Sequence, residues 1–580
     1  MQWRRPIGFA YGEVDNRFWT RHKGLGHSER NSTRKDSDVY TQQPAPTEDS
    51  GAPQRTDVRA ALLGGTTFRS LSEQTLSPRE EKFERTRQTI GLFLAPVVAV
   101  VFALLPLNLD LRQHLLAAVL LGVIVLWICE PVPIPIGGLI GVAAVVVLGV
   151  APASAVLAPF GSTTIFTFIG AFILAQAMLK HGIAQRLAFA VLSAPGVGKS
   201  TYRVVIAFGV ITCLLSAFVS NTATVAMLMP TALGVLVVIA QLMQDRGMVK
   251  ADFDPLRLRV GAALLLMLAY GASVGGLLTP VGSPPNLIGR GLIEEATGVR
   301  ISFAQWMAIA APVCLAMFVV LALVMLLLNR PEIRRLEGVE EYVREQRAAQ
   351  GKMSRAEVNT LIAFGVTVTL WLAPAVASLI GGTESEAYIF LDDRLDEGIV
   401  AVIGASLLFI LPVNWKQRQA TLTWADAAKI DWGTILLFGT GIIFGALLAE
   451  TGLAETIGQG ASDNLNITNI VAITAFSAVL AILISETTSN TASAAVIVPI
   501  VIPLCQAIGV DPFVPALAAT FAASFGFMLP VSTPQNAIVY GTGAVPITRM
   551  IRTGLFFDIL GAALIVTIVP VMIAVVGIGG

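Results

Sequence analysis

Two copies of the tripeptide Ser-Asn-Thr are the residues of this chain best suited to bind small ions. The copies are Ser220-Asn221-Thr222 and Ser489-Asn490-Thr491, which lie 269 positions apart (489 − 220). Each copy sits within a long apolar run, and residues 204–244 carry no charged side chain. Polar groups at membrane depth are costly and usually functional. We therefore predict that the two tripeptides form the working site.

The chemistry expected at this site is the binding of an anion together with small cations. Each tripeptide precedes a helical run, so its side chains can cap that helix while free backbone N–H groups attract an anion. Prolines interrupt two further apolar segments beside Gly282, Ser283, Ser532 and Thr533. Carbonyl oxygens freed there suit an ion such as sodium. The alternatives are a plain helix cap for each tripeptide and a structural kink for each interrupted segment.

Charge balance at the site predicts coupling between the anion and the cations. No Lys or Arg lies within these motifs, so bound cations would have to offset the charge of a dianion. Binding of each would then favour binding of the other. Glu486 lies inside the second apolar run, where it either pairs with a local donor to fix the tip or carries protons.

The composition predicts an all-α polytopic membrane protein. Hydrophobic residues make up 54% of the 580 residues, charged residues only 13%, and the mean hydropathy is +0.72. A soluble domain has about 25% charged residues. The formal net charge of +0 gives no reason to expect a nucleic-acid partner. The four cysteines show no CxxC spacing and the histidines no cluster, so neither a disulfide framework nor a clustered metal site is expected.

The chain divides into four predicted parts, and each membrane half contains a re-entrant hairpin and a broken helix. Residues 1–87 are polar and lack apolar periodicity, which predicts a disordered cytosolic extension. The other parts are a first half at 88–329 (hairpin near 204–244, broken helix near 260–295), a cytosolic linker at 330–356, and a second half at 357–580 (hairpin near 466–508, broken helix near 514–545).

Basic residues predict the orientation. They gather in segments 245–259 and 330–356, whereas the loop at 381–397 is acidic. With basic loops in the cytosol, eleven crossings alternate consistently, the N-terminus lies inside and the C-terminus outside. This count requires each tripeptide segment to enter and leave on the same side. A pair of full spans would satisfy that rule as well, but a compact, apolar-flanked and repeated turn favours a hairpin.

The two halves share three blocks in the same order. Segment 165–184 matches 435–454 at an offset of 270, the tripeptides match at 269, and PVGSPPN at 280–286 matches PVSTPQN at 530–536 at 250. Five predicted crossings separate the first matched pair, so the halves should point opposite ways through the membrane. Inverted repeats with interrupted helices at matching positions are typical of secondary transporters with a midplane site.

These motifs resemble the divalent anion/sodium symporter family over roughly residues 88–580. The matching motifs are SNTAT at 220–224, SNTAS at 489–493, VGSPPN at 281–286 and FMLPVSTPQNAIVYGTG at 527–543, the last similar to a long signature near the family's C-terminal end. The resemblance implies a homodimer in the cell membrane that carries divalent anions with sodium. It also implies an elevator-like shift of hairpins and broken helices against a fixed scaffold.

The resemblance further implies roles for individual residues. The residues matching the substrate contacts are Ser220, Asn221, Thr222, Ser283, Ser489, Asn490, Thr491, Thr533 and Pro534. The residues matching the first sodium site are Ser216, Ser220, Asn221 and Gly282, and those matching the second are Ser485, Thr488, Asn490 and Ser532.

Two positions depart from the family pattern. Gln535 replaces the proline usual in TPPN, which would alter the unwound loop or add a polar contact to a larger substrate. Ser532 stands where alanine is common, but the ligand expected there is a backbone carbonyl, so little is lost.

The retained sodium pattern favours sodium-coupled import over exchange. The leading hypothesis is import of C4-dicarboxylates such as succinate, malate and fumarate, although the sequence does not decide between these anions, citrate and sulfate. Anion exchange and sodium:sulfate symport are the alternatives within the family. An intramembrane enzyme is disfavoured because the sequence has no HExxH motif and no nucleophile–base set. A passive channel is disfavoured because inverted repeats with two polar tips suit alternating access better.

Overall fold

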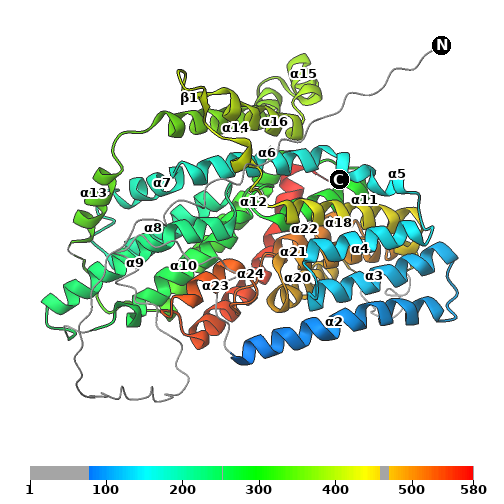
Figure 1. Cartoon of the computed structure of the whole chain (residues 1–580), viewed down its shortest axis with the longest axis horizontal. Helices are drawn as coiled ribbons and strands as arrows, with labels where there is room; N and C mark the ends of the chain where they lie inside the picture. The colour runs from blue at the N-terminus through cyan, green and yellow to red at the C-terminus, as the bar shows by residue number, and fades with distance from the viewer. Residues whose placement is uncertain (1–77, 251–252, 337, 457–468, 579–580) are drawn as a thin grey trace, which may run out of the picture. The chain divides into compact units, whose positions relative to one another are not determined.

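The computed structural model describes residues 78–250, 253–336, 338–456 and 469–578 (Figure 1). Within these ranges the chain is helical apart from turns and one two-stranded sheet, in which β1 (Pro412–Asn414) pairs antiparallel with β2 (Gln419–Ala420), and one isolated bridge. The predicted all-α class is therefore confirmed. Most of the predicted N-terminal extension lies outside the described residues, whereas residues 78–87 form the first turns of α2.

The helices of the first half are α2 (Pro78–Leu104), α3 (Leu111–Cys129), α4 (Ile134–Val147), α5 (Ala153–Leu157), η2 (Ala158–Gly161), α6 (Thr163–Lys180), α7 (Ile183–Leu192), α8 (Thr201–Ser216), α9 (Asn221–Asp245), η3 (Pro255–Arg257), α10 (Arg259–Gly276), α11 (Pro284–Thr297) and α12 (Phe303–Leu328). In this half, two helices flank each predicted motif: α8 and α9 flank the tripeptide turn, and α10 and α11 flank the break.

The helices of the linker and the second half are α13 (Val339–Ala349), α14 (Arg355–Gly381), α15 (Glu386–Arg394), α16 (Glu397–Ile410), α17 (Trp424–Ala427), α18 (Trp432–Glu450), α20 (Ile470–Thr487), α21 (Asn490–Ala507), α22 (Phe513–Ala522), α23 (Pro534–Gly541) and α24 (Ile547–Val576). In the second half a pair of helices again flanks each predicted motif, but the pair at the break, α22 and α23, is short, with 10 and 8 residues. Both predicted broken helices are interrupted as expected, between α10 and α11 and between α22 and α23.

Eleven helices among the described residues are long and apolar enough to cross a membrane. The number equals the predicted number of crossings, but the set differs. It includes α9, α20 and α21, which belong to the predicted hairpins, and it leaves out α4, α16 and α22, which have only 14, 14 and 10 residues. The protein is therefore a multi-pass membrane protein, and the hairpins stay a prediction.

Local sequence explains where several helices begin and end. Ser302 and Gln305 form a reciprocal capping box at the start of α12, which satisfies two backbone N–H groups that the helix itself cannot pair. Between α3 and α4, Glu130 adopts a left-handed conformation (φ 49°), and Pro133 caps the next helix. Proline cannot continue the ladder of a preceding helix, so the apolar run divides in two here.

The helices of the two halves pack in matching pairs. Helix α8 packs against α10 as α20 packs against α22, and α6 packs against α16 as α18 packs against α4. Glycines allow close approach at these contacts, because a β-carbon on Gly275 of α10 would lie 2.3 Å from the backbone of Cys213 in α8. Small residues therefore hold the supporting helices close to the tripeptide helices.

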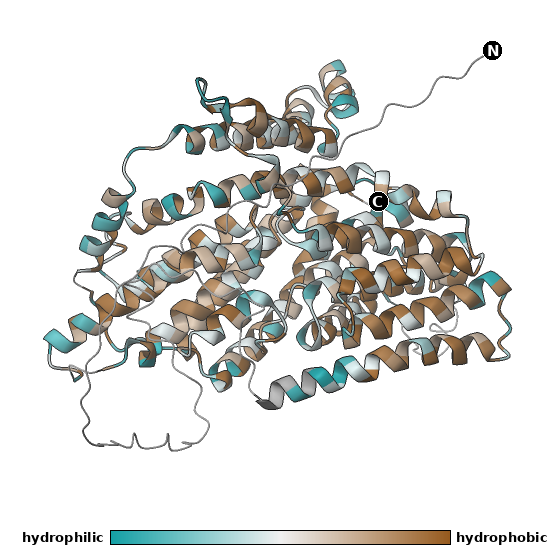
Figure 2. Cartoon of the chain, viewed as in Figure 1, coloured by the Kyte–Doolittle hydropathy of each residue, from teal (hydrophilic) through white to brown (hydrophobic). Residues whose placement is uncertain are grey.

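The surface of α2, α4 and α14 is strongly apolar. Exposed fractions reach 77% for Leu104, 83% for Val147 and 87% for Leu379. Figure 2 shows hydrophobic residues along these helices and hydrophilic residues gathered at loops and on α13. An apolar exposed surface of this kind is expected where helices face lipid.

Candidate functional site

Each tripeptide forms the turn between two helices and caps the second one. Ser220 accepts a hydrogen bond from the Ala223 N–H at 3.4 Å, and Ser489 accepts one from the Ala492 N–H at 3.2 Å. The predicted capping role of the two serines is therefore observed. It satisfies one N–H group of each first turn and leaves the asparagine side chains available for other contacts.

The first tip packs against the break between α10 and α11. The Ser216 hydroxyl donates to Asn221 Oδ1 at 2.6 Å. A β-carbon on Gly276 would lie 2.6 Å from that same oxygen, so the helix end can approach the amide only because residue 276 is glycine. The Asn286 amide holds the break in place by donating to the carbonyls of Gly276 and Thr279 at 2.7 and 2.8 Å.

Backbone carbonyl oxygens converge on Gly282. A β-carbon at this position would lie 2.6 Å from the Gly276 oxygen, 2.9 Å from the Ala217 oxygen and 3.0 Å from the Ser216 oxygen. Three carbonyl oxygens thus lie around one small space beside a helix end and a break, although those of Ala217 and Gly276 also accept hydrogen bonds from Thr279 and Asn286. Such a cluster of hard oxygen atoms favours a small cation.

The second tip repeats this construction at equivalent positions. The Ser485 hydroxyl lies 2.8 Å from Asn490 Oδ1, and the Asn490 amide donates to the Ser524 carbonyl at 3.2 Å. The Asn536 amide donates to the Gly526 and Leu529 carbonyls at 2.7 and 3.1 Å, as Asn286 does in the first half. A β-carbon on Gly526 would lie 3.0 Å from Asn490 Oδ1, which matches the close approach at Gly276.

Glu486 makes the second tip different from the first. Its carboxylate accepts from the N–H groups of Phe527 and Met528 at 2.5 and 2.8 Å, and the Ser532 hydroxyl lies 2.9 Å from its other oxygen. The side chain is 3% exposed. Two roles were predicted for Glu486: pairing with a local donor to fix the tip, or carrying protons. These contacts correspond to the first role, since they connect the tip to the break between α22 and α23.

The predicted site residues differ in exposure and in side-chain contacts. Ser220 and Pro534 are exposed, Thr222, Ser489 and Thr491 are half-buried, and Ser283 and Thr533 are buried. Thr533 caps α23 by accepting from the Asn536 N–H at 3.3 Å. The Thr488 hydroxyl donates to the Ile484 carbonyl of its own helix at 2.8 Å, so it points back along α20.

Four helices begin at the predicted motifs, and they pack across the two halves. Helix α9 starts at Asn221, α21 at Asn490, α11 at Pro284 and α23 at Pro534. Helix α9 packs against α23 of the other half, and α21 packs against α11 (Figure 1). The breaks also meet, because α10 packs against α23 and α11 against α22. Tertiary packing therefore brings together helix starts that lie 313 (534 − 221) and 206 (490 − 284) positions apart in sequence.

Gln535 takes part in this contact between the halves. The side chain is 2% exposed, and its amide donates to the Ser273 hydroxyl of α10 at 3.0 Å. Two effects were predicted for the missing proline: an altered loop, or a polar contact to a larger substrate. The buried amide is bonded to Ser273, and this position gives no support to the substrate contact. The side chain instead links the second break to the helix that supports the first tip.

Sequence reasoning overlooked the residues that hold the breaks. Gly276, Gly526, Asn286 and Asn536 contact the tips or the broken backbone, yet no role was predicted for them. A signal was present, since Asn286 and Asn536 are the last residues of the matched PVGSPPN and PVSTPQN blocks.

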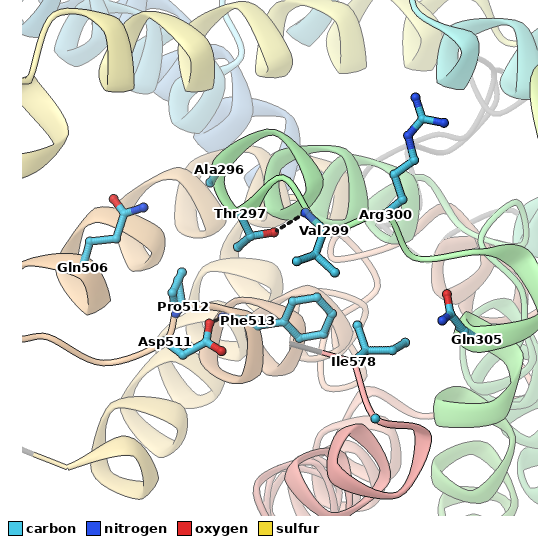
Figure 3. A pocket seen from close by; sticks show the side chains of 11 residues that line it. Ala296, Thr297, Val299, Arg300, Gln305, Gln506, Asp511, Pro512, Phe513 and Ile578 are labelled. Atoms are coloured by element: carbon cyan, nitrogen blue, oxygen red, sulfur yellow. Dashed lines mark hydrogen bonds between the residues drawn. The ribbon is translucent and has the colours of Figure 1, made fainter. Parts of the chain in front are cut away.

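Two cavities lie away from the tips. A cavity of about 530 Å³ is lined by the ends of α11 and α21 and by Ile578, and it contains none of the predicted site residues (Figure 3). A second, of about 700 Å³, lies at the start of α8. The candidate site is instead placed by its polar chemistry, because hydroxyl, amide and backbone carbonyl groups gather at the tips.

The sequence of the whole membrane region matches a known family. The model of the sodium:sulfate symporter transmembrane region matches residues 86–578. The chain belongs to this family. The predicted membership among the divalent anion/sodium symporters is thereby confirmed, and the protein belongs with membrane transporters and not with enzymes.

Individual relatives cover nearly the same length. The chain is 31% identical over 496 residues to the sodium-dependent dicarboxylate transporter SdcS of Staphylococcus saprophyticus, which covers 85% of this chain and 92% of that protein. It is 29% identical over 505 residues to SdcS of Staphylococcus aureus, which covers 86% and 94%. Among solved structures, MtrF of Neisseria gonorrhoeae aligns with a TM-score of 0.49 and 15% identity, covering 83% of this chain and 94% of that one.

Proposed function

We propose that this protein imports divalent organic anions, C4-dicarboxylates such as succinate, malate and fumarate, together with sodium. The observation that carries the proposal is the repeated cluster at Asn221 and Asn490, where a hydroxyl, an amide and carbonyl oxygens meet. The motifs that form this cluster contain no Lys or Arg. The relatives named sodium-dependent dicarboxylate transporters support the choice of both ions.

The first sodium site is proposed at Ser216, Ser220, Asn221 and Gly282. The convergence of three carbonyl oxygens on Gly282 supports this assignment. The second site is proposed at Ser485, Thr488, Asn490 and Ser532. The hydroxyls of Thr488 and Ser532 already contact Ile484 and Glu486, so these two residues would bind sodium through their backbone carbonyls.

The anion is proposed to bind between the tips, at Ser220, Asn221, Thr222, Ser283, Ser489, Asn490, Thr491, Thr533 and Pro534. Four helices begin at these motifs, and the positive ends of helices stabilise anions. Sodium held beside each asparagine would supply the remaining positive charge. Binding of anion and binding of sodium would therefore reinforce each other, as symport requires.

Movement of the site across the membrane is proposed to follow an elevator mechanism in a homodimer. The repeated packing of α8 on α10 and α20 on α22 supports two tip units of similar construction. The re-entrant hairpins, the inverted repeat, the cytosolic N-terminus and the outward C-terminus belong to this same proposal.

Uptake into proteoliposomes tests the function. We expect accumulation of labelled succinate with external sodium and none when choline replaces it. Undiminished uptake without sodium would remove the proposal, and counterflow into preloaded vesicles would then indicate exchange. Because the family model carries the name sodium:sulfate symporter, sulfate is the second candidate substrate. Competition of sulfate and citrate against labelled succinate separates the candidates.

A further inference from the structure

A basic cavity lies at the start of α8, at the opposite end of that helix from the first tip. It has a volume of about 700 Å³ and is lined by four cationic side chains and one acidic one among the described residues. The cations are Lys199, Arg203, Arg334 and Arg335, and the acid is Glu340. All five residues are exposed at the surface, so the cavity is open to a soluble ligand or to a headgroup.

Two chain segments form this cavity by pairing their backbones. The Leu336 N–H donates to the Lys199 carbonyl at 3.1 Å, and the Thr201 N–H donates to the Arg334 carbonyl at 3.2 Å. The Thr201 side chain adds a bond to the Ile333 carbonyl at 2.5 Å. The loop before α8 is therefore fixed against the segment after α12, and cations from both segments face the same space.

Most of this positive charge has no counter-charge in the described parts of the chain. No ion pair joins Lys199, Arg203, Arg334 or Arg335 to a described carboxylate, although Arg203 donates to the Gly196 carbonyl at 3.1 Å. The start of α8 adds to the charge, because Ser200 provides no side-chain cap and, of the first N–H groups, Thr201 is the one bonded to the Arg334 carbonyl. Uncapped N–H groups at a helix start attract anions.

We propose that this cavity binds a phosphate-bearing anion. Two or more guanidinium and ammonium groups around one space match the oxygens of a phosphate or diphosphate. The segment Gly196–Thr201 reads GVGKST and contains Gly-Lys-Ser, the last three residues of the phosphate-loop pattern G-x-x-x-x-G-K-[ST], although Ser193 stands in place of the first glycine of that pattern. It follows helix α7 and not a strand, so binding is inferred here and not nucleotide hydrolysis.

The position of the cavity links the ligand to the candidate site. Helix α8 has 16 residues, so its two ends lie about 24 Å apart. It begins at the cavity and ends at Ser216, whose hydroxyl contacts Asn221. A bound anion would join the base of α8 to the segment leading into α13, and it would stabilise the arrangement of both.

Binding is tested on the purified full-length chain in detergent, without any transport measurement. Unfolding temperature is recorded against inorganic pyrophosphate, with sodium and ionic strength held constant. A second arm compares added phosphatidylglycerol with phosphatidylcholine. We expect the variant Lys199→Gln/Arg335→Gln to bind the stabilising anion about tenfold or more weakly, which raises the anion concentration needed for half of the full rise in unfolding temperature. The matched control Arg347→Gln/Lys352→Gln removes two exposed charges outside the cavity and should bind like the wild type.

The two arms identify the source of the phosphate. Stabilisation by pyrophosphate that the cavity variant loses supports a soluble ligand, and the same result with phosphatidylglycerol supports a lipid headgroup. The proposal is overturned if neither anion stabilises the wild type, or if both double variants lose the effect equally. Should the double variant not fold, Arg334→Gln gives the same comparison. Because sodium-dependent uptake is not measured, failure here leaves the proposed transport function unaffected.

Discussion

Gly282→Ala should disable the first sodium site by crowding it. The new methyl group would lie 2.6 Å from the Gly276 oxygen and 2.9 Å from the Ala217 oxygen. Carbon and oxygen atoms in contact lie about 3.3 Å apart, so these carbonyls would have to retreat by about 0.7 and 0.4 Å. Ligand distances tolerate only about 0.2 Å, so coordination would be lost.

The expected consequences concern both ion affinity and stability. The sodium concentration for half-maximal uptake should rise about tenfold or more, which corresponds to about 1.4 kcal/mol of binding free energy. Overpacking of the site should also lower the free energy of unfolding by about 1–3 kcal/mol. Uptake by proteoliposomes over a sodium series measures the first effect. The sodium-induced rise in unfolding temperature, without substrate, measures ion binding directly.

A matched glycine separates crowding of the site from the general effect of a methyl group. Gly365 lies in α14 with no atom within 4 Å of an added β-carbon, so Gly365→Ala should keep wild-type sodium dependence. It should be slightly more stable, because alanine favours a helix over glycine by about 1 kcal/mol. Wild-type sodium dependence in Gly282→Ala would refute the reasoning, since the carbonyls could then not be the ligands.

Four further substitutions test other parts of the structure. Asn221→Ala or Asn490→Ala should abolish sodium-dependent uptake, whereas membrane insertion, measured by surface labelling, should stay normal. Wild-type uptake in either variant would contradict the proposal that each amide binds both sodium and the anion. Arg290→Gln should lower the free energy of unfolding by about 3–5 kcal/mol. In the wild type the guanidinium pairs with the largely buried carboxylates of Glu397 at 2.7 Å and Glu294 at 2.9 Å, and the substitution would leave both without a cation. An unchanged unfolding temperature would contradict this. Asp558→Asn should raise the free energy of unfolding, because Asp558 is 4% exposed and neither carboxyl oxygen has a hydrogen-bond partner among the described residues, so an uncharged amide costs less to bury there. A less stable variant would show that the carboxyl group makes an interaction that the amide cannot replace.

The second tip can be compared with the first at the position where Gly282→Ala would add a methyl group. Ser532 occupies the position equivalent to Gly282, and its hydroxyl contacts Glu486, which has alanine as its counterpart at position 217. A side chain is thus accommodated in the second half where the first half has none. The two tips are therefore expected to differ in sensitivity to substitution, with the first tip more easily blocked by added volume.

The sequence by itself determined those features that depend on residues close together in the chain. Ser220 and Ser489 each cap the helix that follows by accepting a hydrogen bond from the N–H three residues further along the chain. The prolines after Ser283 and Thr533 begin α11 and α23, where the motifs predict breaks. Hydropathy and length predicted a multi-pass membrane protein, and the motifs predicted its family. Caps and proline breaks act within one helical turn, so a local pattern is enough to recognise them.

Only the tertiary structure decided which distant groups meet. Glu486 accepts hydrogen bonds from residues 41 and 42 positions away, and Gln535 donates to Ser273 across 262 positions. The convergence of carbonyl oxygens on Gly282 likewise depends on α8 and α10 packing at glycine distance. Backbone oxygens are identical in every residue type, so no sequence motif records where they will gather. Their convergence arises when packing aligns a helix end with a break.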